Sequence, residues 1–420
     1  MVNKIKKWLK VLGPGLITGA ADDDPSGIAT YSQTGAQFGY GQLWTAVFML
    51  PFQIAVQEAC ARIGAVKGKG LMAVIKENYS KKVVYLVGIL ILIANTINIG
   101  ADIGAMVAAT QLIFPVNFAL LAIDFTFLIL ALEIFTTYKT YSKILKWLAV
   151  TLIAYPITVF MVQQPWGEIL MRTFIPHFEL SFQFLFVITG VLGTTISPYM
   201  FFWQASEEVE EEKEKHLKKV TFGFLKNLRI DTAIGMLFSE LATWSIIVVG
   251  ATVLNQNGIS DIKTSADAAR ALEPLVQTFP NAGLWAKIIF ATGIVGLGML
   301  SIPVLSGSAS YAIAETFGWK EGLNLKLKSA KGFYGVIIAS TLIGLLINFV
   351  GIDPVKALIY TAVINGVVAV PLIFLVAKIA QDEKIMKENK SGILSKVFVW
   401  LTFGGMATAA IAMIATFFHG

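Results

Sequence analysis

Three consecutive carboxylates interrupt the first apolar stretch of the chain, in the run Asp22-Asp23-Asp24-Pro25-Ser26-Gly27. A carboxylate at an unwound point inside a membrane is expensive and is by default functional. Pro25 also removes a backbone donor, so nearby carbonyl groups need another partner, which a cation can supply. Asp24 is therefore the first candidate metal ligand, and Asp22 and Asp23 are candidates for drawing cations along a pathway. The alternative is an aqueous loop between two short helices.

A second apolar stretch is broken in the same way by Gly193-Thr194-Thr195-Ile196-Ser197-Pro198. Thr194 offers a backbone carbonyl and Ser197 a hydroxyl, and both are hard oxygen ligands for a cation. The alternative for this break is a proline kink with local side-chain bonding to the backbone, which is common in membrane helices. Because two apolar stretches are broken alike, the pair indicates a transporter substrate site near the bilayer midplane.

A few other polar residues lie inside apolar stretches. Asp102 and Glu240 lie deep enough to line a pathway, and Asn365 could supply a further oxygen. Each is equally well explained as a hydrogen-bonded group between packed helices. No histidine lies inside an apolar stretch, since all three fall in loops or at the chain end: His177, His216 and His419.

The composition requires a bilayer as the solvent for much of the surface. Of the 420 residues, 56% are hydrophobic and only 14% are charged, whereas a soluble domain carries about 25% charged residues. The net charge of +6 is explained by Lys and Arg in cytoplasmic loops, without a nucleic-acid partner. The single cysteine, Cys60, excludes an internal disulfide and a cysteine metal cluster. The basic segment 1–10 is not followed by a cleavable signal sequence.

Apolar stretches long enough to cross about 30 Å of hydrocarbon recur eleven times. They lie near 11–38 (interrupted), 43–61, 83–113, 117–136, 144–163, 183–205 (interrupted), 230–254, 284–315, 333–351, 355–377 and 397–418. The prediction is an all-α polytopic membrane protein whose single membrane domain spans 1–420.

The loop charges orient these eleven stretches. With the N-terminus inside, 28 of the 33 lysines and arginines fall in cytoplasmic segments and five fall outside. This places the C-terminus outside. The broken stretches are the first and the sixth, and five is odd, so residues 183–377 repeat residues 11–163 with inverted topology. The stretch 397–418 is an extra C-terminal helix.

The mixed charges of the run Glu207–Lys219 occur at helical spacing, just after the sixth stretch. Such a pattern is typical of a solvated helix. The alternative is a regulatory metal sensor.

Several motifs resemble the NRAMP family of divalent-metal transporters, which has the LeuT-type fold. The residues Gly13-Pro14-Gly15, Asp24-Pro25 and Thr34-Gly35-Ala36-Gln37-Phe38-Gly39-Tyr40 look like the first helix of that family. Ala61-Arg62-Ile63-Gly64 and Gly68-Lys69-Gly70-Leu71 look like the end of its second helix. The resemblance covers the whole chain and implies a five-plus-five inverted repeat, with helices 1 and 6 broken at the midplane.

The chain departs from the family pattern at the proposed site. Gly27 stands where the family's first break has a ligating Asn, and Ser197 stands where its second break has a ligating Met. Tyr199 and Gln204 replace two histidines, and Glu240 falls where the family has an Asn. The implied metal ligands are therefore Asp24, Gly27, Thr194, Ser197 and Asn365.

These departures favour a hard cation. A thioether favours Mn²⁺, Fe²⁺ and Cd²⁺, whereas hydroxyl and carbonyl oxygens suit Mg²⁺. Loss of the Asn leaves room for water, and Mg²⁺ usually keeps several waters. The substitutions resemble those of NRAMP-related magnesium transporters. The leading hypothesis is thus alternating-access import of Mg²⁺, and of Mn²⁺, as substrate.

The loss of both family histidines argues against proton coupling, because His is the side chain suited to proton exchange near neutrality. Asp102 remains on the route that the resemblance implies, while Tyr199 and Glu240 line the pathway. One alternative is a proton-coupled Mn²⁺/Fe²⁺ symporter. A remoter alternative is a Na⁺-coupled amino-acid symporter, but the three aspartates would repel the carboxylate of an amino-acid substrate.

The sequence predicts that the protein is not an enzyme, needs no cofactor, and is a monomer in the plasma membrane. The predicted partners are the lipid bilayer and the transported divalent metal.

Overall fold

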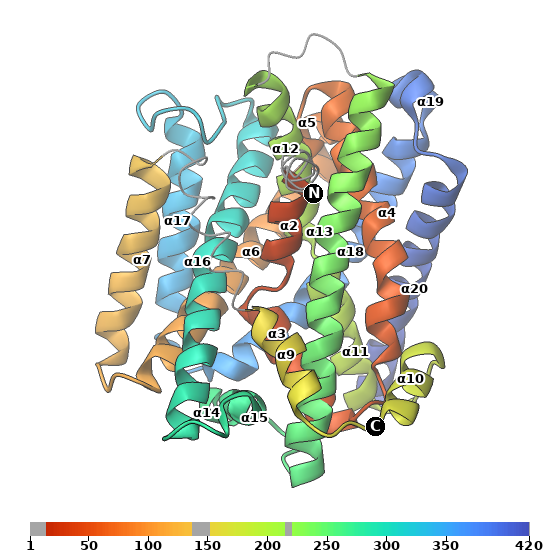
Figure 1. The fold of residues 1–420 in the computed structure, drawn as a ribbon. Coiled ribbons are helices and arrows are strands. Elements are labelled where there is room, and N and C mark those ends of the chain that lie inside the picture. The colour runs from red at the N-terminus through yellow and green to blue at the C-terminus, as the bar shows by residue number, and fades with distance from the viewer. Residues whose placement is uncertain (1–13, 137–151, 215–220, 420) are drawn as a thin grey trace, which may run out of the picture.

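The computed structural model describes residues 14–136, 152–214 and 221–419, and in these residues the fold is entirely helical (Figure 1). The first half contains α2 (Pro14–Asp22), α3 (Pro25–Phe38), α4 (Trp44–Lys67), α5 (Leu71–Asn78), α6 (Lys81–Gln111), α7 (Phe118–Phe135), α9 (Ala154–Met161) and α10 (Trp166–Phe174). The second half contains α11 (Phe182–Thr195), α12 (Pro198–Glu214), α13 (Phe222–Val249), the π-helix η2 (Gly250–Leu254), α14 (Ser265–Ala269), α15 (Glu273–Val276), α16 (Ala282–Phe317), α17 (Lys331–Ile347), α18 (Pro354–Gln381), α19 (Glu383–Met386) and α20 (Ile393–His419).

Eight helical segments of the described chain are long and apolar enough to cross a membrane. They are Trp44–Lys67, Lys81–Gln111, Phe118–Phe135, Phe182–Glu214, Phe222–Asn257, Ala282–Phe317, Pro354–Gln381 and Ile393–Phe418. The chain is therefore a multi-pass membrane protein. The sequence predicts eleven spans. The three beyond these eight are the interrupted first helix, the shorter helix α17, and the stretch 144–163, which lies partly outside the described residues. That number remains a prediction.

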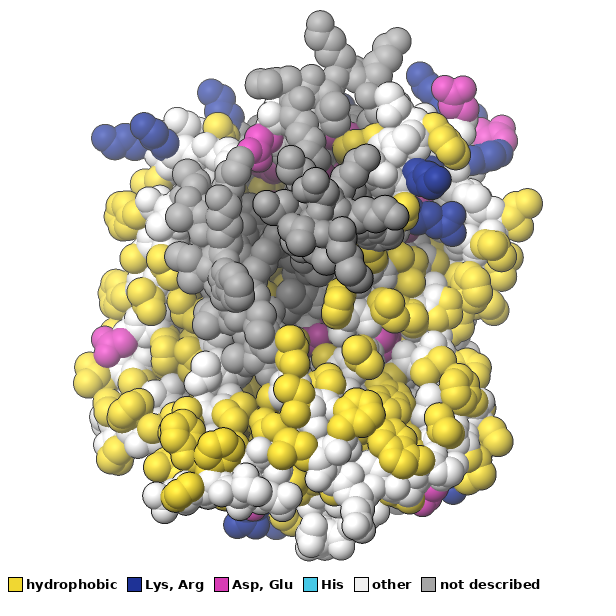
Figure 2. Space-filling model, viewed as in Figure 1, with side chains coloured by type: hydrophobic (Ala, Val, Ile, Leu, Met, Phe, Trp, Pro, Cys, Tyr) yellow, Lys and Arg dark blue, Asp and Glu magenta, His cyan; other side chains and the backbone are white. Residues whose placement is uncertain are grey.

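Among the described residues on the face shown in Figure 2, hydrophobic side chains are spread over the flank, while lysines and arginines lie near the two ends. Large apolar side chains stay exposed among the described residues, such as Leu86, Phe127 and Phe238. In water such a surface would be an aggregation hazard, but in a bilayer it faces lipid. We call the end that carries α5, α19 and the loop 318–330 the basic end.

Two helices are interrupted, and each restarts at a proline. Asp23 and Asp24 separate α2 from α3, which begins at Pro25, and Ile196 and Ser197 separate α11 from α12, which begins at Pro198. Proline is favoured at the first position of a helix because its missing N–H needs no partner there. Figure 1 shows α2 and α12 in the upper half of the molecule and α3 and α11 in the lower half.

Glycines hold the half-helices directly against their neighbours. A Cβ on Gly19 of α2 would lie 2.4 Å from the Gly235 carbonyl oxygen of α13, and one on Gly35 of α3 would lie 2.3 Å from Ile247 O. A Cβ on Gly193 of α11 would lie 2.1 Å from Ala362 O of α18. Such backbone contacts are how helices associate closely in membranes, where hydrophobicity does not drive them together.

The prediction of a solvated helix for the charged run Glu207–Lys219 is wrong for its first turn, and residues 215–219 of the run lie outside the described residues. Glu207, Glu208 and Val209 are buried at the basic end, while Lys213 and Glu214 are exposed. The periodicity of the charges predicted a helix correctly. It could not reveal that α16 and the loop 318–330 pack against the same turn.

Gly64→Ala should lower stability, because its Cβ would lie 2.2 Å from the Ala205 carbonyl oxygen where α4 meets α12. Overpacking of this kind costs about 1–3 kcal/mol, more than the roughly 1 kcal/mol that alanine gains in helix propensity. The matched control is Gly404→Ala on α20, where a Cβ meets no atom within 4 Å. Thermal unfolding of the detergent-purified protein measures both, and equal unfolding temperatures would contradict the prediction.

Candidate functional site

The two interruptions lie against each other inside the bundle. A Cβ on Gly27 would lie 3.2 Å from the Thr194 hydroxyl oxygen. The Tyr31 hydroxyl is 3.0 Å from the Thr195 hydroxyl, and the Tyr199 hydroxyl donates to the Ala21 carbonyl over 2.9 Å. Residues about 170 positions apart in sequence therefore share one site at the two breaks.

Asp24 accepts more hydrogen bonds than Asp22, a neighbouring carboxylate of this site. Its Oδ1 accepts from the Ser26 hydroxyl at 2.6 Å and from the Gly27 N–H at 2.8 Å. Its Oδ2 accepts from the Asn98 amide at 2.9 Å. Asp24 also caps α3, where the helix dipole favours a negative charge. These bonds use three of about four acceptor positions of the carboxylate, which leaves capacity for a bound cation.

The second break presents neutral oxygens. The Ser197 hydroxyl lies 2.6 Å from Gly193 O and 2.9 Å from Thr194 O, so its proton bonds to the backbone of its own helix. This is the local bonding that the sequence left open as an alternative, although the oxygen of Ser197 keeps its lone pairs. The Thr194 hydroxyl is buried and has no hydrogen-bond partner. Sequence reasoning had assigned only the carbonyl of Thr194 as a ligand.

Asn365 on α18 is 1% exposed, and neither side-chain oxygen nor nitrogen has a hydrogen-bond partner. The neighbouring Gly366 packs directly against α11, with its Cβ position 2.5 Å from Thr189 O. Buried polar groups are nearly always hydrogen-bonded, so an unpaired amide here needs a reason. A cation or its water would provide one.

A second group of carboxylates lies beside Asp24. Asp22 accepts hydrogen bonds from Gln53 of α4 and Ser239 of α13, and Gln53 also donates to Thr195 O at 2.8 Å. Glu240 is buried with both oxygens unpaired and interacts electrostatically with Asp22 and Asp23. The structure therefore brings the predicted pathway acids Asp22, Asp23 and Glu240 together.

Asp102 on α6 is a further acid near Asp24. It accepts from the Ser301 hydroxyl of α16 at 2.7 Å, and its second oxygen is unpaired. It is close enough to Asp24 for an electrostatic interaction. The residues that sequence reasoning did not assign, Gln53, Asn98 and Ser239, all serve to hold Asp22 and Asp24. Their only signal in the sequence is a polar side chain inside an apolar stretch.

The coordination chemistry of the site is that of oxygen. In the described ranges, no three side chains of His, Cys, Asp or Glu are placed to hold a metal ion. Met200 packs in a hydrophobic cluster with Tyr199 and Trp203. The arrangement therefore offers one oriented carboxylate, neutral oxygens and further acids nearby, which suits a cation that keeps part of its water.

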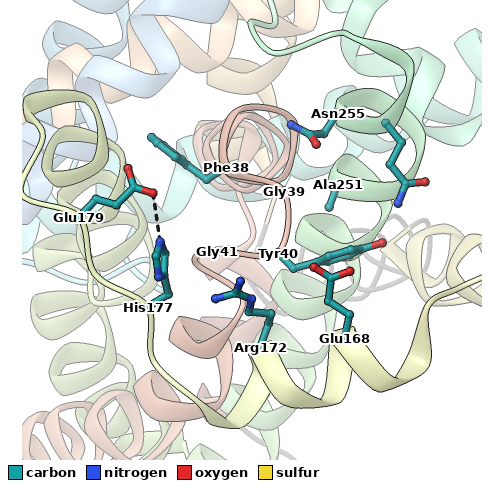
Figure 3. Close-up of a pocket in the computed structure, with 11 residues that line it drawn as sticks. Phe38, Gly39, Tyr40, Gly41, Glu168, Arg172, His177, Glu179, Ala251 and Asn255 are labelled. Atoms are coloured by element: carbon teal, nitrogen blue, oxygen red, sulfur yellow. Dashed lines mark hydrogen bonds and ion pairs between the residues drawn. The ribbon is translucent and has the colours of Figure 1, made fainter.

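A separate cavity of about 300 Å³ lies at the far end of α3 (Figure 3). Its lining includes Phe38, Glu168 and Arg172, and the His177 ring bonds to Glu179 at 3.1 Å. Since α3 has 14 residues, its ends are about 20 Å apart, which separates this cavity from Asp24.

Two interrupted helices that meet inside a bundle of apolar spans define a membrane protein of the LeuT-like class. A crystal structure of the Eremococcus coleocola manganese transporter has a TM-score of 0.75 at 18% identity and covers 98% of this chain and 88% of its own. Mhp1, a nucleobase-cation-symport-1 family transporter, has a TM-score of 0.58 at 14% identity, with 97% and 92% covered. At these identities the likeness shows the fold alone.

Residues 15–416 match the family described as natural resistance-associated macrophage protein-like, or Nramp. The chain belongs to the Nramp family, which is a family of transporters and not of enzymes. The divalent metal cation transporter MntH of Caldanaerobacter subterraneus subsp. tengcongensis is 27% identical over 417 residues, covering 98% of this chain and 92% of the relative. MntH of Ralstonia nicotianae is 23% identical over 430 residues, covering 97% and 91%.

Asn98→Ala should weaken metal binding, because it removes the donor that orients Asp24 Oδ2. Loss of such an outer partner typically lowers metal affinity about 10–100-fold. The matched control is Asn78→Ala, whose amide bonds only to Val74 O within its own helix, at 2.8 Å. Calorimetric titration of the purified variants with Mn²⁺ checks this, and equal affinities would contradict it.

Proposed function

We propose that this chain imports divalent metal cations through the plasma membrane by alternating access, and that Mg²⁺ is a substrate together with Mn²⁺. The observation that carries the proposal is the oriented carboxylate of Asp24 at one break, whose donor Gly27 lies against the hydroxyl of Thr194 at the other. A buried carboxylate beside unpaired oxygens attracts a cation and repels an anion.

The ligand chemistry supports Mg²⁺. None of the groups bonded to Asp24 or closest to Gly27 carries sulfur; they come from Asp22, Ser26, Gly27, Tyr31, Asn98 and Thr194. Oxygen ligands do not favour Mn²⁺ over Mg²⁺ as a thioether does. Besides Asp24, the nearby acids Asp22 and Asp102 provide negative charge. They do not form a complete set of metal ligands, so the site suits an ion that keeps part of its water.

A proton-coupled Mn²⁺ or Fe²⁺ symporter is the second candidate. The curated relatives are named divalent metal cation transporters, and the solved neighbour is a manganese transporter. These names favour Mn²⁺ more strongly than Mg²⁺.

Uptake without protons can be driven by the membrane potential. The potential supplies about 2.3 kcal/mol per charge per 100 mV, or roughly 4.6 kcal/mol for a divalent ion, which suffices for an abundant cation.

The proposed topology has eleven transmembrane helices in a monomer. Its N-terminus and basic end face the cytoplasm, and its C-terminus faces outward, because Lys and Arg concentrate in cytoplasmic loops. Residues 11–163 and 183–377 form the two inverted repeats, and 397–418 is the additional helix. On this topology α2 and α12 lie on the cytoplasmic side of the site, and α3 and α11 on the outer side.

Asp24→Ala should abolish uptake of Mn²⁺ into proteoliposomes, because it removes the only carboxylate at the break that is held by three donors. In the wild type, an excess of Mg²⁺ should compete with Mn²⁺, and a pH dye inside the vesicles should report no acidification. A suitable control is Asp353→Ala, since Asp353 only caps α18 by accepting from Val355 N at 3.0 Å, about 18 Å along the helix from Asn365. Mn²⁺ uptake that ignores Mg²⁺ and acidifies the lumen would instead establish the second candidate.

Ser197→Met should shift selectivity toward soft ions, since it introduces a thioether where the resemblance places the family's methionine. The concentration of Cd²⁺ that inhibits uptake by half should fall about tenfold relative to that of Mg²⁺, which is the size of effect expected when a contact to the metal changes. Ser197→Ala is the control, because it removes the hydroxyl without adding sulfur. Dose–response curves for both ions measure the ratio, and the same ratio in both variants would refute a ligand position for residue 197.

A further inference from the structure

A row of exposed aromatic rings joins three segments at the basic end. Tyr85 lies in the first turns of α6, Phe317 ends α16, and Trp319 belongs to the loop 318–330. The ring centroids of Tyr85 and Phe317 are 6.2 Å apart, and Phe317 stacks on Trp319 at 5.1 Å. The indole of Trp319 covers Gly332, whose Cβ position lies 2.4 Å from a ring carbon, so the row ends at the start of α17.

The rings of this row keep their polar tips free. Tyr85, Phe317 and Trp319 are each half-exposed. Within the described residues, neither the hydroxyl of Tyr85 nor the indole N–H of Trp319 forms a hydrogen bond. Tyrosine and tryptophan occupy the headgroup level of a bilayer because each has an apolar body and a polar tip. The row therefore lies at the height where lipid headgroups begin.

Lysines flank the aromatic row at both ends. Lys81 and Lys82 precede Tyr85 by one turn of α6, Lys331 directly precedes Gly332, and all three lysines are exposed. In the described part of the chain, none of them forms an ion pair. We call the whole set the α6–α17 surface, which comprises Lys81, Lys82, Tyr85, Phe317, Trp319 and Lys331.

Neighbouring charges of the same end are used inside the protein. Lys76 donates to the main-chain carbonyl of Glu315 at 3.1 Å, where α16 ends. Glu321, the acid of the loop 318–330, interacts electrostatically with Lys213 of α12. The positive charge of the α6–α17 surface is therefore available to an anion outside the protein.

An apolar stripe leads from this surface toward the middle of the bilayer. Lys82, Leu86, Ile89 and Ile93 follow one another at spacings of four, three and four residues, which places them on one face of α6. The three apolar members are more than half exposed, whereas Val87 on the opposite face is buried. Over this stripe the helix rises about 16 Å, which is about the hydrocarbon depth of one leaflet.

We propose that the α6–α17 surface binds one anionic phospholipid from the leaflet at the basic end. The phosphate lies between the lysines at the two ends of the aromatic row, and the glycerol region lies on the rings. One acyl chain follows the stripe from Leu86 to Ile93. A zwitterionic lipid fits the same stripe, but the ammonium group of its headgroup weakens the attraction to the lysines. Charge complementarity therefore predicts selectivity for the anionic headgroup.

The bound lipid joins α6 to α17 across the loop 318–330, so it stabilises contacts on the flank of the molecule away from the two interruptions. On the proposed topology the leaflet is the cytoplasmic one, which carries the anionic lipids. The binding itself depends neither on that topology nor on the transported ion.

Native mass spectrometry of the detergent-purified full chain tests the proposal, with phosphatidylglycerol compared with phosphatidylcholine of the same acyl chains. The wild type should half-saturate at a lower concentration of phosphatidylglycerol. Each lysine near an anionic lipid contributes about 1 kcal/mol, or about fivefold, so Lys82→Gln with Lys331→Gln should need at least about tenfold more of this lipid. The matched control, Lys384→Gln with Lys396→Gln, removes two other exposed lysines of the same end and should bind as the wild type does.

Equal phosphatidylglycerol binding by the double variant and the control overturns the inference, and so does equal affinity of the wild type for the two lipids. Glycerol 3-phosphate, which has the charge but no acyl chain, should not compete. Competition would show a site for a soluble anion, and a dimer that excludes the lipid would show that a second copy covers the surface; either result overturns the proposal.

A single variant provides a second measurement should the double variant fail to fold. Lys331→Gln alone should need about fivefold more phosphatidylglycerol, again because each lysine contributes about 1 kcal/mol, and an unchanged affinity overturns the inference. Transport is decided separately. A wild type that moves no divalent cation in proteoliposomes refutes the proposed function, while the lipid titration still decides the α6–α17 surface.

Discussion

A carboxylate buried at the start of a half-helix is the constraint on which the rest of the structure depends. Asp24 is 1% exposed, and no lysine or arginine of the described chain pairs with it. Its charge is stabilised by the N-terminus of α3, by Ser26 and by Asn98. In a medium of low dielectric constant such stabilisation is incomplete without a cation. The break in the helix creates this situation, because only an unwound segment can direct N–H groups and a side-chain carboxylate to one point.

The surrounding helices keep that segment in place. Gln53 joins Asp22 to the carbonyl of Thr195, so a single amide connects α4 with both interruptions. Tyr199 reaches back to Ala21 and Tyr31 reaches Thr195. These side chains come from positions far apart in sequence. Tyr199 and Gln53 satisfy backbone carbonyls that the interruptions would otherwise leave unpaired inside the membrane, and Tyr31 adds a bond between side chains.

The sequence predicted the helical class, the two interruptions and the carboxylate at the first of them. Those predictions rest on local signals: Pro25 and Pro198 cannot continue a helix, and charged residues are rare in apolar stretches. The partners Gln53, Asn98 and Ser239 could not be predicted, because their roles arise where distant helices pack together. The burial of Glu207 and Glu208 was missed for the same reason. Helical spacing shows which residues share a face, but not what covers that face.

The glycine contacts determine which parts of the molecule can slide independently. With Gly193 against Ala362 and Gly19 against Gly235, main chain rests on main chain, and no flexible side chain lies between to absorb a shift. Each half-helix is thereby mechanically coupled to one continuous helix, α11 to α18 and α2 to α13. A rearrangement that exposes Asp24 to one side of the membrane must therefore carry these helices as pairs. Gly35 of α3 also rests on Ile247 of α13, so α13 holds both halves of the first broken helix, and the hinge falls at the second interruption, between α11 and α12.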